Sequence, residues 1–313
     1  GQVRDLSPAS QSDSDRNDEY ERHPEHVLTV VPPVAPVGRE RRKDRRNRGV
    51  VSGAYYSPMI RLSVSDTTAT ITIDDPDRRN ALSNEAMVEL GAALKSACAD
   101  SAVRVVVVTG AGDRAFSAGG DLAGGFVDAP LADHGNRGAL ADLVRAMRRC
   151  PKPIVARVNG HALGGGLGLV AGCDIAIAAD HALFGTPEIT VGLWPMMITA
   201  ALRPLVPRRP LLEMMLTGRR INAAEAVELG IINRVVSSVD LDQAIDETTA
   251  VLAERSPAAM ALGKAAFYAV EDMDLDTALD HLHIGLTAVA STEDAQEGVK
   301  AFLDKREPQW RGR

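Results

Sequence analysis

Two glycine-rich segments contain residues that could do chemistry. The first is 115–122, AFSAGGDL, and the second is 159–166, NGHALGGG. Each follows an apolar run of strand type and leads toward a helix, where the first backbone N–H groups have no partner. Glycine lets a ligand oxygen approach such groups closely, so two segments side by side could form an oxyanion hole for an enolate or a tetrahedral intermediate. The alternative is that the glycines only allow strand and helix to pack closely.

The second segment also contains a weak nucleotide-binding pattern. Residues 166–171, GLGLVA, match G-x-G-x-x-A, which would place a pyrophosphate at a helix N-terminus. The helix would be very short, and the acidic residues Asp174 and Asp180 come too early for the ribose contact. These two features count against a dinucleotide site, and the chain contains no P-loop motif.

Alternating strands and helices must position the two glycine-rich segments. A period-two pattern predicts a hairpin, near-continuous apolar runs predict strands buried on both faces, and amphipathic stretches predict crossover helices. The predicted hairpin covers 60–64 and 69–74, the buried strands 103–109, 153–158 and 175–179, and the helices 81–100 and 136–150. After residue 195 the pattern is helical through to Trp310. This order predicts an α/β protein.

Composition excludes several classes of protein. The 313 residues include 35 Lys and Arg against 42 Asp and Glu, a net charge of −7, which argues against a dedicated nucleic-acid binder. No apolar run approaches the roughly 20 residues of a membrane span, and the first residues lack the apolar stretch of a secretory signal. The three cysteines predict reduced thiols and a cytoplasmic location.

The first 58 residues differ from the rest of the chain. They lack sustained apolar periodicity and contain a basic run at 39–48 that Glu40 and Asp44 interrupt. Such a run could bind nucleic acid or a membrane, but a solvated tail is the expected reading. The predicted organisation is a disordered extension over 1–58, an α/β core over 59–255 and a helical region over 256–313.

Several motifs in this order resemble the crotonase (enoyl-CoA hydratase/isomerase) superfamily. They are AFSAGGDL, then NGHALGGGLGLVAGCDIAIAAD about 40 residues later, and FGTPEITVGLWP. DPDRRNALS resembles the family's nucleotide-contacting turn, and EGVKAFLDKREPQW resembles its C-terminal helix. The resemblance implies a spiral of ββα units, a C-terminal trimerisation region and acyl-CoA thioester substrates. It also implies a homotrimer or a dimer of trimers, and no cofactor beyond the coenzyme A (CoA) of the substrate.

The resemblance assigns roles by position. The N–H groups of Ala118 and Gly165 would form the oxyanion hole, and Glu188 would be the catalytic glutamate. Residues expected to contact the substrate or its CoA are Arg78, Ala81, Leu82, Gly119, Gly120, Asp121, Phe302 and Lys305. No metal site is expected.

One position departs from the family's hydratases, which carry a second glutamate three residues after the oxyanion-hole glycine. Here that position is Gly168. A single glutamate favours isomerase-type proton transfer over hydration. Two alternatives stay open: a hydratase with a non-standard second acid, for which Asp128, Asp133 and His134 are candidates, and a member that binds acyl-CoA without turnover.

Overall fold

The computed structural model describes residues 59–122 and 134–313, and these belong to one compact unit, Val50–Arg313. The predicted disorder of 1–58 and the candidates Asp128 and Asp133 lie outside the described residues. Within the described part, no helix is both long enough and apolar enough to cross a membrane.

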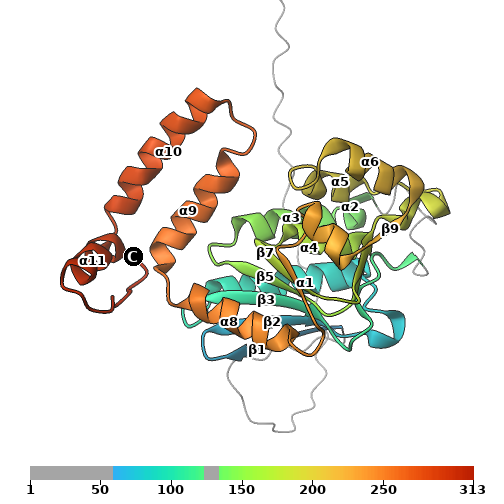
Figure 1. Ribbon diagram of the computed structural model, residues 1–313, viewed down its shortest axis with the longest axis horizontal. Coiled ribbons are helices and arrows are strands. Elements are labelled where there is room, and N and C mark those ends of the chain that lie inside the picture. Colours follow the sequence, from blue (N-terminus) through green and yellow to red (C-terminus); the bar gives the residue numbers. More distant parts are fainter. Residues whose placement is uncertain (1–58, 123–133) are drawn as a thin grey trace, which may run out of the picture. The chain divides into compact units, whose positions relative to one another are not determined.

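A six-stranded sheet forms the centre of this unit (Figure 1). Its order is β1-β2-β3-β5-β7-β10; β1 and β2 pair antiparallel, and the other neighbours are parallel. The bounds are β1 (Ile60–Ser65), β2 (Thr68–Ile73), β3 (Val105–Gly110), β5 (Ile154–Val158), β7 (Ile175–Ala179) and β10 (Arg234–Val236). The predicted hairpin and the three predicted buried strands are confirmed, whereas β10 was not predicted.

Both faces of the central sheet are covered, which explains the near-continuous apolar run in β3. Val105 and Val107 point to one face, where they pack with Leu241 and Ile245 of α8 (Leu241–Ala253). Their neighbours Val106 and Val108 belong to the main core on the other face, together with residues of α1 and α3. A strand buried on both sides can carry apolar residues at every position.

A second sheet of short strands lies beside the first. Its order is β4 (Ala115–Ser117), β6 (His161–Leu163), β8 (Leu183–Gly185) and β9 (Arg220–Asn222), and only β8 and β9 pair antiparallel. Each strand is three residues long, too short to show a period in the sequence. The sequence therefore predicted glycine-rich turns where β6 lies and helix where β9 lies.

The helices agree with the predicted pattern at most positions. Ser83 caps α1 by accepting from Ala86 N–H at 3.1 Å, and Gly218 ends α6 with φ +67°. The second glycine-rich segment, 159–166, includes the start of the helix that it was expected to precede, because α4 begins at Gly165. The remaining bounds are α1 (Asn84–Ala99), α2 (His134–Arg137), α3 (Ala139–Arg149), α4 (Gly165–Gly172), α5 (Met196–Leu202), α6 (Arg208–Thr217), α7 (Ala223–Glu228), α9 (Pro257–Ala269), α10 (Leu275–Ala290) and α11 (Glu293–Leu303), with 3-10 turns η1 (Pro76–Arg78) and η3 (Pro187–Val191).

A disulfide joins Cys98 to Cys150, so the prediction of reduced thiols is wrong for these two cysteines. Helices α1 and α3 both lead into neighbouring parallel strands, β3 and β5, and their C-terminal ends therefore meet at one edge of the sheet. The two Cα atoms lie 6.1 Å apart although the residues are 52 positions apart in sequence. Cys173 remains a free thiol. The cysteine argument for a cytoplasmic location loses its support.

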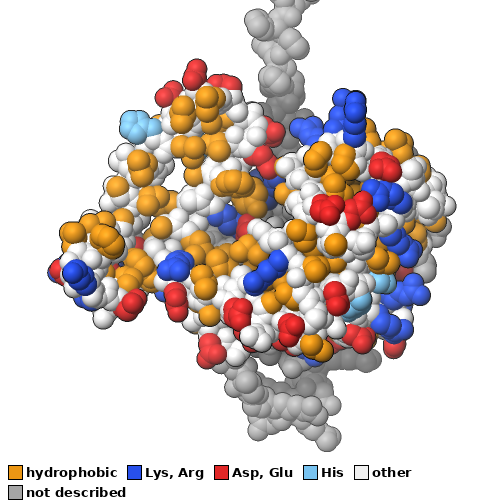
Figure 2. Space-filling view, viewed as in Figure 1, with side chains coloured by type: hydrophobic (Ala, Val, Ile, Leu, Met, Phe, Trp, Pro, Cys, Tyr) orange, Lys and Arg blue, Asp and Glu red, His pale blue; other side chains and the backbone are white. Residues whose placement is uncertain are grey.

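Helix α9 is anchored to the core by a half-buried polar cluster. Lys264 Nζ donates to Asp174 Oδ2 at 2.6 Å, and Tyr268 OH donates to Asp174 Oδ1 at 2.8 Å. Helices α10 and α11 pack on α9 and expose apolar side chains, which Figure 2 shows in orange over these helices. Among them, Leu275, Ile284 and Phe302 are 73%, 73% and 82% exposed.

Candidate active site

The two glycine-rich segments meet at the carboxyl ends of β4 and β6. Gly119 has φ +93°, and a Cβ placed on it would lie 2.8 Å from the Leu163 carbonyl oxygen and 3.0 Å from Gly165 N. A side chain there would collide with backbone, so this contact requires glycine. A Cβ on Gly165 would lie 3.6 Å from Gly120 N. The predicted juxtaposition of the two segments is therefore observed.

The structure corrects one of the two predicted oxyanion donors. Ala118 N–H donates to the Arg79 carbonyl oxygen at 2.9 Å. A backbone N–H that already has a short bond inside the protein is not available to a substrate oxygen. Ala118 therefore cannot supply the second donor.

Gly120 is the candidate that remains for this role, because neighbouring N–H groups of an extended backbone point to opposite sides. It forms a parallel bridge with Leu82, in which Leu82 N–H donates to Gly119 O at 2.8 Å and Asp121 N–H donates to Leu82 O at 2.9 Å. Gly120 N–H then points away from Leu82. Among the described residues neither Gly120 N–H nor Gly165 N–H has a partner, and Gly165 is the first residue of α4, where the helix dipole adds partial positive charge.

Glu188 lies against the turn that presents Gly165. It follows Pro187 at the start of η3, directly after β8. Its Oε1 is 2.8 Å from the place of a Cβ on Gly164, which has φ +52°, and its Oε2 is buried without a hydrogen-bond partner in the described part of the chain. Burial raises the pKa of Glu188, and a backbone hydrogen bond opposes this effect only in part. A carboxyl group in this state is suited to take up and release a proton.

Gly168 lies one helical turn after Gly165, at the position of the missing second glutamate. A Cβ added there would lie 3.2 Å from Ile198 Cγ1 of α5, and Ile198 is only 5% exposed. The side of the site that could hold a second carboxylate is therefore filled by an aliphatic side chain.

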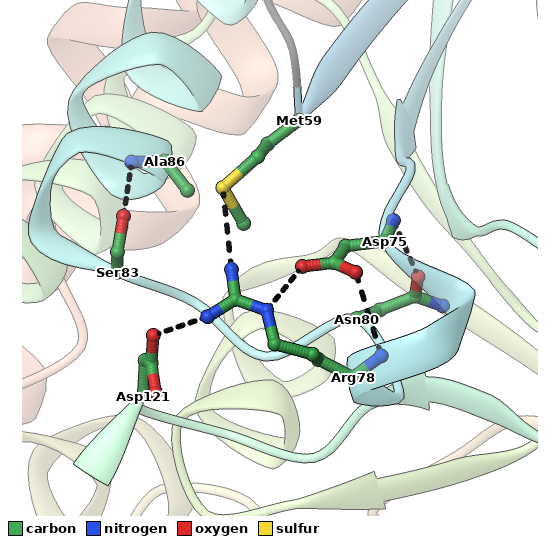
Figure 3. Close-up of polar contacts among 7 residues, drawn as sticks. All are labelled: Met59, Asp75, Arg78, Asn80, Ser83, Ala86 and Asp121. Carbon is green, nitrogen blue, oxygen red and sulfur yellow. Dashed lines mark hydrogen bonds and ion pairs between the residues drawn. The ribbon is translucent and has the colours of Figure 1, made fainter. Parts of the chain in front are cut away.

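Arg78 connects the η1 turn to the loop that contains Gly120 (Figure 3). Its Nη1 donates to Asp121 Oδ2 at 2.7 Å and its Nε donates to Asp75 Oδ2 at 2.8 Å, while Nη2 lies 4.0 Å from Met59 sulfur. Two carboxylates on one guanidinium raise the pKa of Arg78 and offset its charge. In this structure Arg78 and Asp121 position the donor loop, and the predicted contact of Arg78 with the CoA nucleotide stays a prediction.

The other predicted CoA contacts have different outcomes. Leu82 is 1% exposed, and both its N–H and its carbonyl oxygen are used in the bridge to Gly120, so it cannot contact a ligand directly. Ala81 beside it is partly exposed. Phe302 lies near the end of α11 and Lys305 lies just after it. This helix packs on α9 and α10, and the structure does not bring the two residues together with Glu188.

The remaining candidates do not join the site as acids or metal ligands. His134 begins α2 and is exposed. The described residues contain no group of His, Cys, Asp and Glu that could hold a metal ion. Gly166 and Gly168 lie inside α4 and not in a turn before it, so the nucleotide-binding pattern lacks its structural context.

Two functional features were missed in the sequence. The role of Gly120 depends on which N–H groups form the hydrogen bonds of the bridge to Leu82. The only local signal for it is that N–H groups along an extended segment such as 117–121 point alternately to opposite sides. Ile198 opposite Gly168 comes from a helix 30 residues further along the chain, and no local pattern links the two positions.

Comparisons with known proteins agree with this geometry. The family model for enoyl-CoA hydratase/isomerase matches residues 63–313. Relatives named carnitinyl-CoA dehydratase from Salmonella arizonae and Escherichia coli K12 are 37% and 36% identical, over 82% of this chain and 99% and 100% of theirs.

Solved structures of the same kind superpose well. An enoyl-CoA hydratase from Mycobacterium smegmatis has a TM-score of 0.78 at 34% identity and covers 81% of this chain and 99% of its own. Human enoyl Coenzyme A hydratase domain-containing protein 3 has a TM-score of 0.77 at 32% identity, covering 80% and 99%. The fold, the paired donor glycines and the match over most of the chain lead to one conclusion: the chain belongs to the enoyl-CoA hydratase/isomerase family.

Proposed function

We propose that this enzyme moves a proton at C2 of an acyl-CoA thioester with Glu188 as its single acid/base, and that it shifts a double bond from C3–C4 to C2–C3. The observation that carries the proposal is that, in the described part of the chain, Glu188 lies against Gly164, next to the Gly165 N–H group, and its Oε2 is buried without a hydrogen-bond partner. The carboxylate of Asp121 is held by Arg78, and Ile198 occupies the side of the site next to Gly168.

The reaction needs one base and one acid in sequence. Glu188 takes the proton from C2 of a 3-enoyl thioester, and the electron pair moves onto the thioester oxygen. The Gly120 and Gly165 N–H groups stabilise that enolate oxygen, and removal of one such donor typically costs about 100–1000-fold in kcat. Protonated Glu188 then returns the proton at C4, which yields the 2-enoyl thioester and regenerates the carboxylate. No cofactor beyond the CoA of the substrate is needed.

Dehydration is the second candidate, because relatives that are 35–37% identical to this chain are named carnitinyl-CoA dehydratase. One carboxylate could serve here too. Glu188 would take the C2 proton of a 3-hydroxyacyl thioester and give it to the leaving hydroxyl on C3. Hydration follows the same path in reverse, so the same Glu188 would activate the water at C3, and Ile198 offers neither that water nor the leaving hydroxyl a second hydrogen-bond partner.

A panel of three substrates separates these reactions. We expect the wild type to convert 3-hexenoyl-CoA at least about 100-fold faster than it hydrates crotonyl-CoA. Conversion of 3-hydroxybutyryl-CoA without conversion of 3-hexenoyl-CoA would assign the dehydratase instead. Binding of all three without turnover would identify a non-catalytic member. Glu188→Gln should abolish any turnover, and Glu228→Gln at the exposed end of α7 is the matched control.

The exposed apolar side chains of α10 and α11 support a homotrimer or a dimer of trimers. Leu275, Ile284, Phe302 and Leu303 are each more than 70% exposed, and such a surface is expected to be covered by other copies of the chain. In that assembly Phe302 and Lys305 would reach a neighbouring CoA. Light scattering at micromolar concentration tests this proposal, and a monomer would contradict it.

A further inference from the structure

The outer face of the small sheet contains a cavity that the proposed reaction does not use. Side chains alternate across these strands, so Phe116, Ala162, Phe184 and Ile221 point into the core and are 0–1% exposed. The residues beside them in sequence, among them Ala115, His161, Leu163 and Arg220, line a cavity of ≈ 690 Å³ on the opposite face. This volume is within the range of about 300–1,000 Å³ typical of small-molecule sites.

Three arginines from separate parts of the chain converge on this cavity. Arg79 follows η1, Arg114 precedes β4 and Arg220 begins β9, and Asp113 is the single carboxylate among the lining residues. The formal charge of these four side chains is therefore positive. This is unusual in a protein whose net charge is −7.

Two pairs of neighbouring arginines differ in their ion pairs to the described part of the chain. Arg78 is paired with Asp75 and Asp121, and Arg219 is paired with Glu225 at 2.7 Å. Their direct neighbours, Arg79 and Arg220, line the cavity and have no ion pair with any described residue, and neither does Arg114. In both Arg-Arg pairs, one guanidinium is used inside the fold and the other is left at the cavity.

Of the two histidines that line the cavity, His161 also offers a donor, whereas His181 is held by its neighbours. Leu183 N–H donates to His161 Nδ1 at 3.2 Å, so the neutral ring carries its proton on Nε2. Burial lowers the pKa of His161, and His181, Arg220 and Arg79 lower it further, which places it in a positive field. His181 Nε2 lies 2.8 Å from the Asp113 carbonyl oxygen, and its Nδ1 lies 3.6 Å from Asp180.

We propose that this cavity is a second site, which binds the phosphoryl group of a small molecule. Arginine is suited to this ligand because its planar N–H groups match two phosphate oxygens at once. Neither Glu188 nor the two donor glycines are among the described residues that line the cavity, so the proposal does not depend on the proposed reaction.

The test is calorimetric titration of the full chain with inorganic pyrophosphate at constant ionic strength. We expect saturable binding in the wild type and a loss of at least about tenfold in affinity in Arg114→Gln/Arg220→Gln, since charge-assisted bonds to phosphate are lost. Arg208→Gln on α6, an exposed arginine outside the cavity, should bind as the wild type does.

Four outcomes would overturn the proposal. Pyrophosphate affinity that is equal in the double variant would do so, as would binding of sulfate with equal strength. Displacement of pyrophosphate by saturating CoA would show that the cavity is part of the CoA path. A double variant that changes oligomeric state and keeps its pyrophosphate affinity would show that the arginines face another copy of the chain.

A measurement on the wild type covers the case in which the double variant does not fold. Phenylglyoxal modifies accessible arginines, and mass spectrometry locates the products. We expect pyrophosphate to protect Arg79, Arg114 and Arg220 and to leave Arg208 reactive. Equal modification with and without pyrophosphate would refute the proposal.

Discussion

Ile198 packs on Gly168, with its Cγ1 3.2 Å from the place that a Cβ on Gly168 would occupy. A glutamate at position 168 would therefore meet Ile198, and the two side chains could not both keep this arrangement. Gly168 belongs to the same face of α4 as Gly165, one turn away, so a carboxylate there would face the thioester of the proposed reaction. The Ile198 side chain from α5 occupies that space, so this side of the site is apolar.

The first prediction concerns this apolar side of the site. Gly168→Glu alone should not raise hydration of crotonyl-CoA, because the new side chain must displace Ile198. Gly168→Glu/Ile198→Ala makes room for the carboxylate and a water, and it should hydrate crotonyl-CoA about 100-fold or more faster than Ile198→Ala alone. Since Ile→Ala in a core costs about 2–5 kcal/mol, melting curves must show that both variants are folded at the assay temperature. Equal hydration rates in the two folded variants would mean that Gly168 does not face the reacting carbons.

The second prediction concerns the donor at Gly165. Gly165→Pro removes the N–H at the first position of α4, where proline is tolerated by a helix. We expect kcat to fall about 100–1000-fold. Gly165→Ala is the matched control, because it keeps the N–H and its Cβ makes an ordinary contact with Gly120 N. A folded proline variant with the same kcat as the alanine variant would remove Gly165 from the mechanism.

The correction from Ala118 to Gly120 shows where sequence reasoning reached its limit. The motif placed the donor within AFSAGGDL, and the predicted strand at 103–109 placed that segment directly after a buried strand. Which of four consecutive N–H groups faces the substrate depends on the bridge between Gly120 and Leu82, and on the bond from Ala118 to Arg79. Both are contacts across about 40 residues of chain, and a local pattern does not contain them.

Other features of the fold also divide into those that local sequence patterns predict and those that depend on contacts between distant residues. The hairpin, the buried strands β3, β5 and β7, and the helix α1 follow from apolar period and caps, and they were predicted. The three-residue strands of the small sheet have no measurable period, and the Cys98–Cys150 bond depends on where two helices end. Glu188 was predicted from a motif, but its burial against Gly164 could be learned only from the fold.

The third prediction concerns Arg78. Because Arg78 is held by Asp75 and Asp121, Arg78→Gln should loosen the donor loop and lower kcat, with the same effect on an acyl-CoA and on the matching acyl-pantetheine thioester, which lacks the nucleotide. Steady-state kinetics on both substrates measures this. A rise in KM for the acyl-CoA alone would instead show that Arg78 binds the nucleotide phosphates.

The fourth prediction concerns pH. Glu188 must be ionised to take a proton, and burial raises its pKa, so kcat/KM should fall as the pH drops through a value above that of an ordinary glutamate. Below that value we expect a loss of about tenfold per pH unit. A profile that stays flat down to the pKa of an exposed carboxylate would contradict the assignment of Glu188 as the base.

The same burial predicts a gain in stability when the charge is removed. A raised pKa in the folded state means that the wild type gains stability as the pH falls through that pKa and loses it as the pH rises. Glu188→Gln should therefore have a higher Tm than the wild type at pH 7, and the difference should shrink on acidification. Calorimetry at several pH values checks this, with Glu228→Gln as the control for an exposed glutamate. A Tm difference that is independent of pH would show that Glu188 is not charged in a buried site.

Exchange of the C2 hydrogens of a bound saturated acyl-CoA with deuterated water tests the central claim most directly, because it reports proton removal without any later step. Mass spectrometry of butyryl-CoA after incubation with the enzyme should show deuterium at C2 with the wild type and with Glu228→Gln. With Glu188→Gln the exchange rate should fall by about 100–10,000-fold. Exchange that continues at the wild-type rate in folded Glu188→Gln would contradict the account, since another group would then be removing the proton.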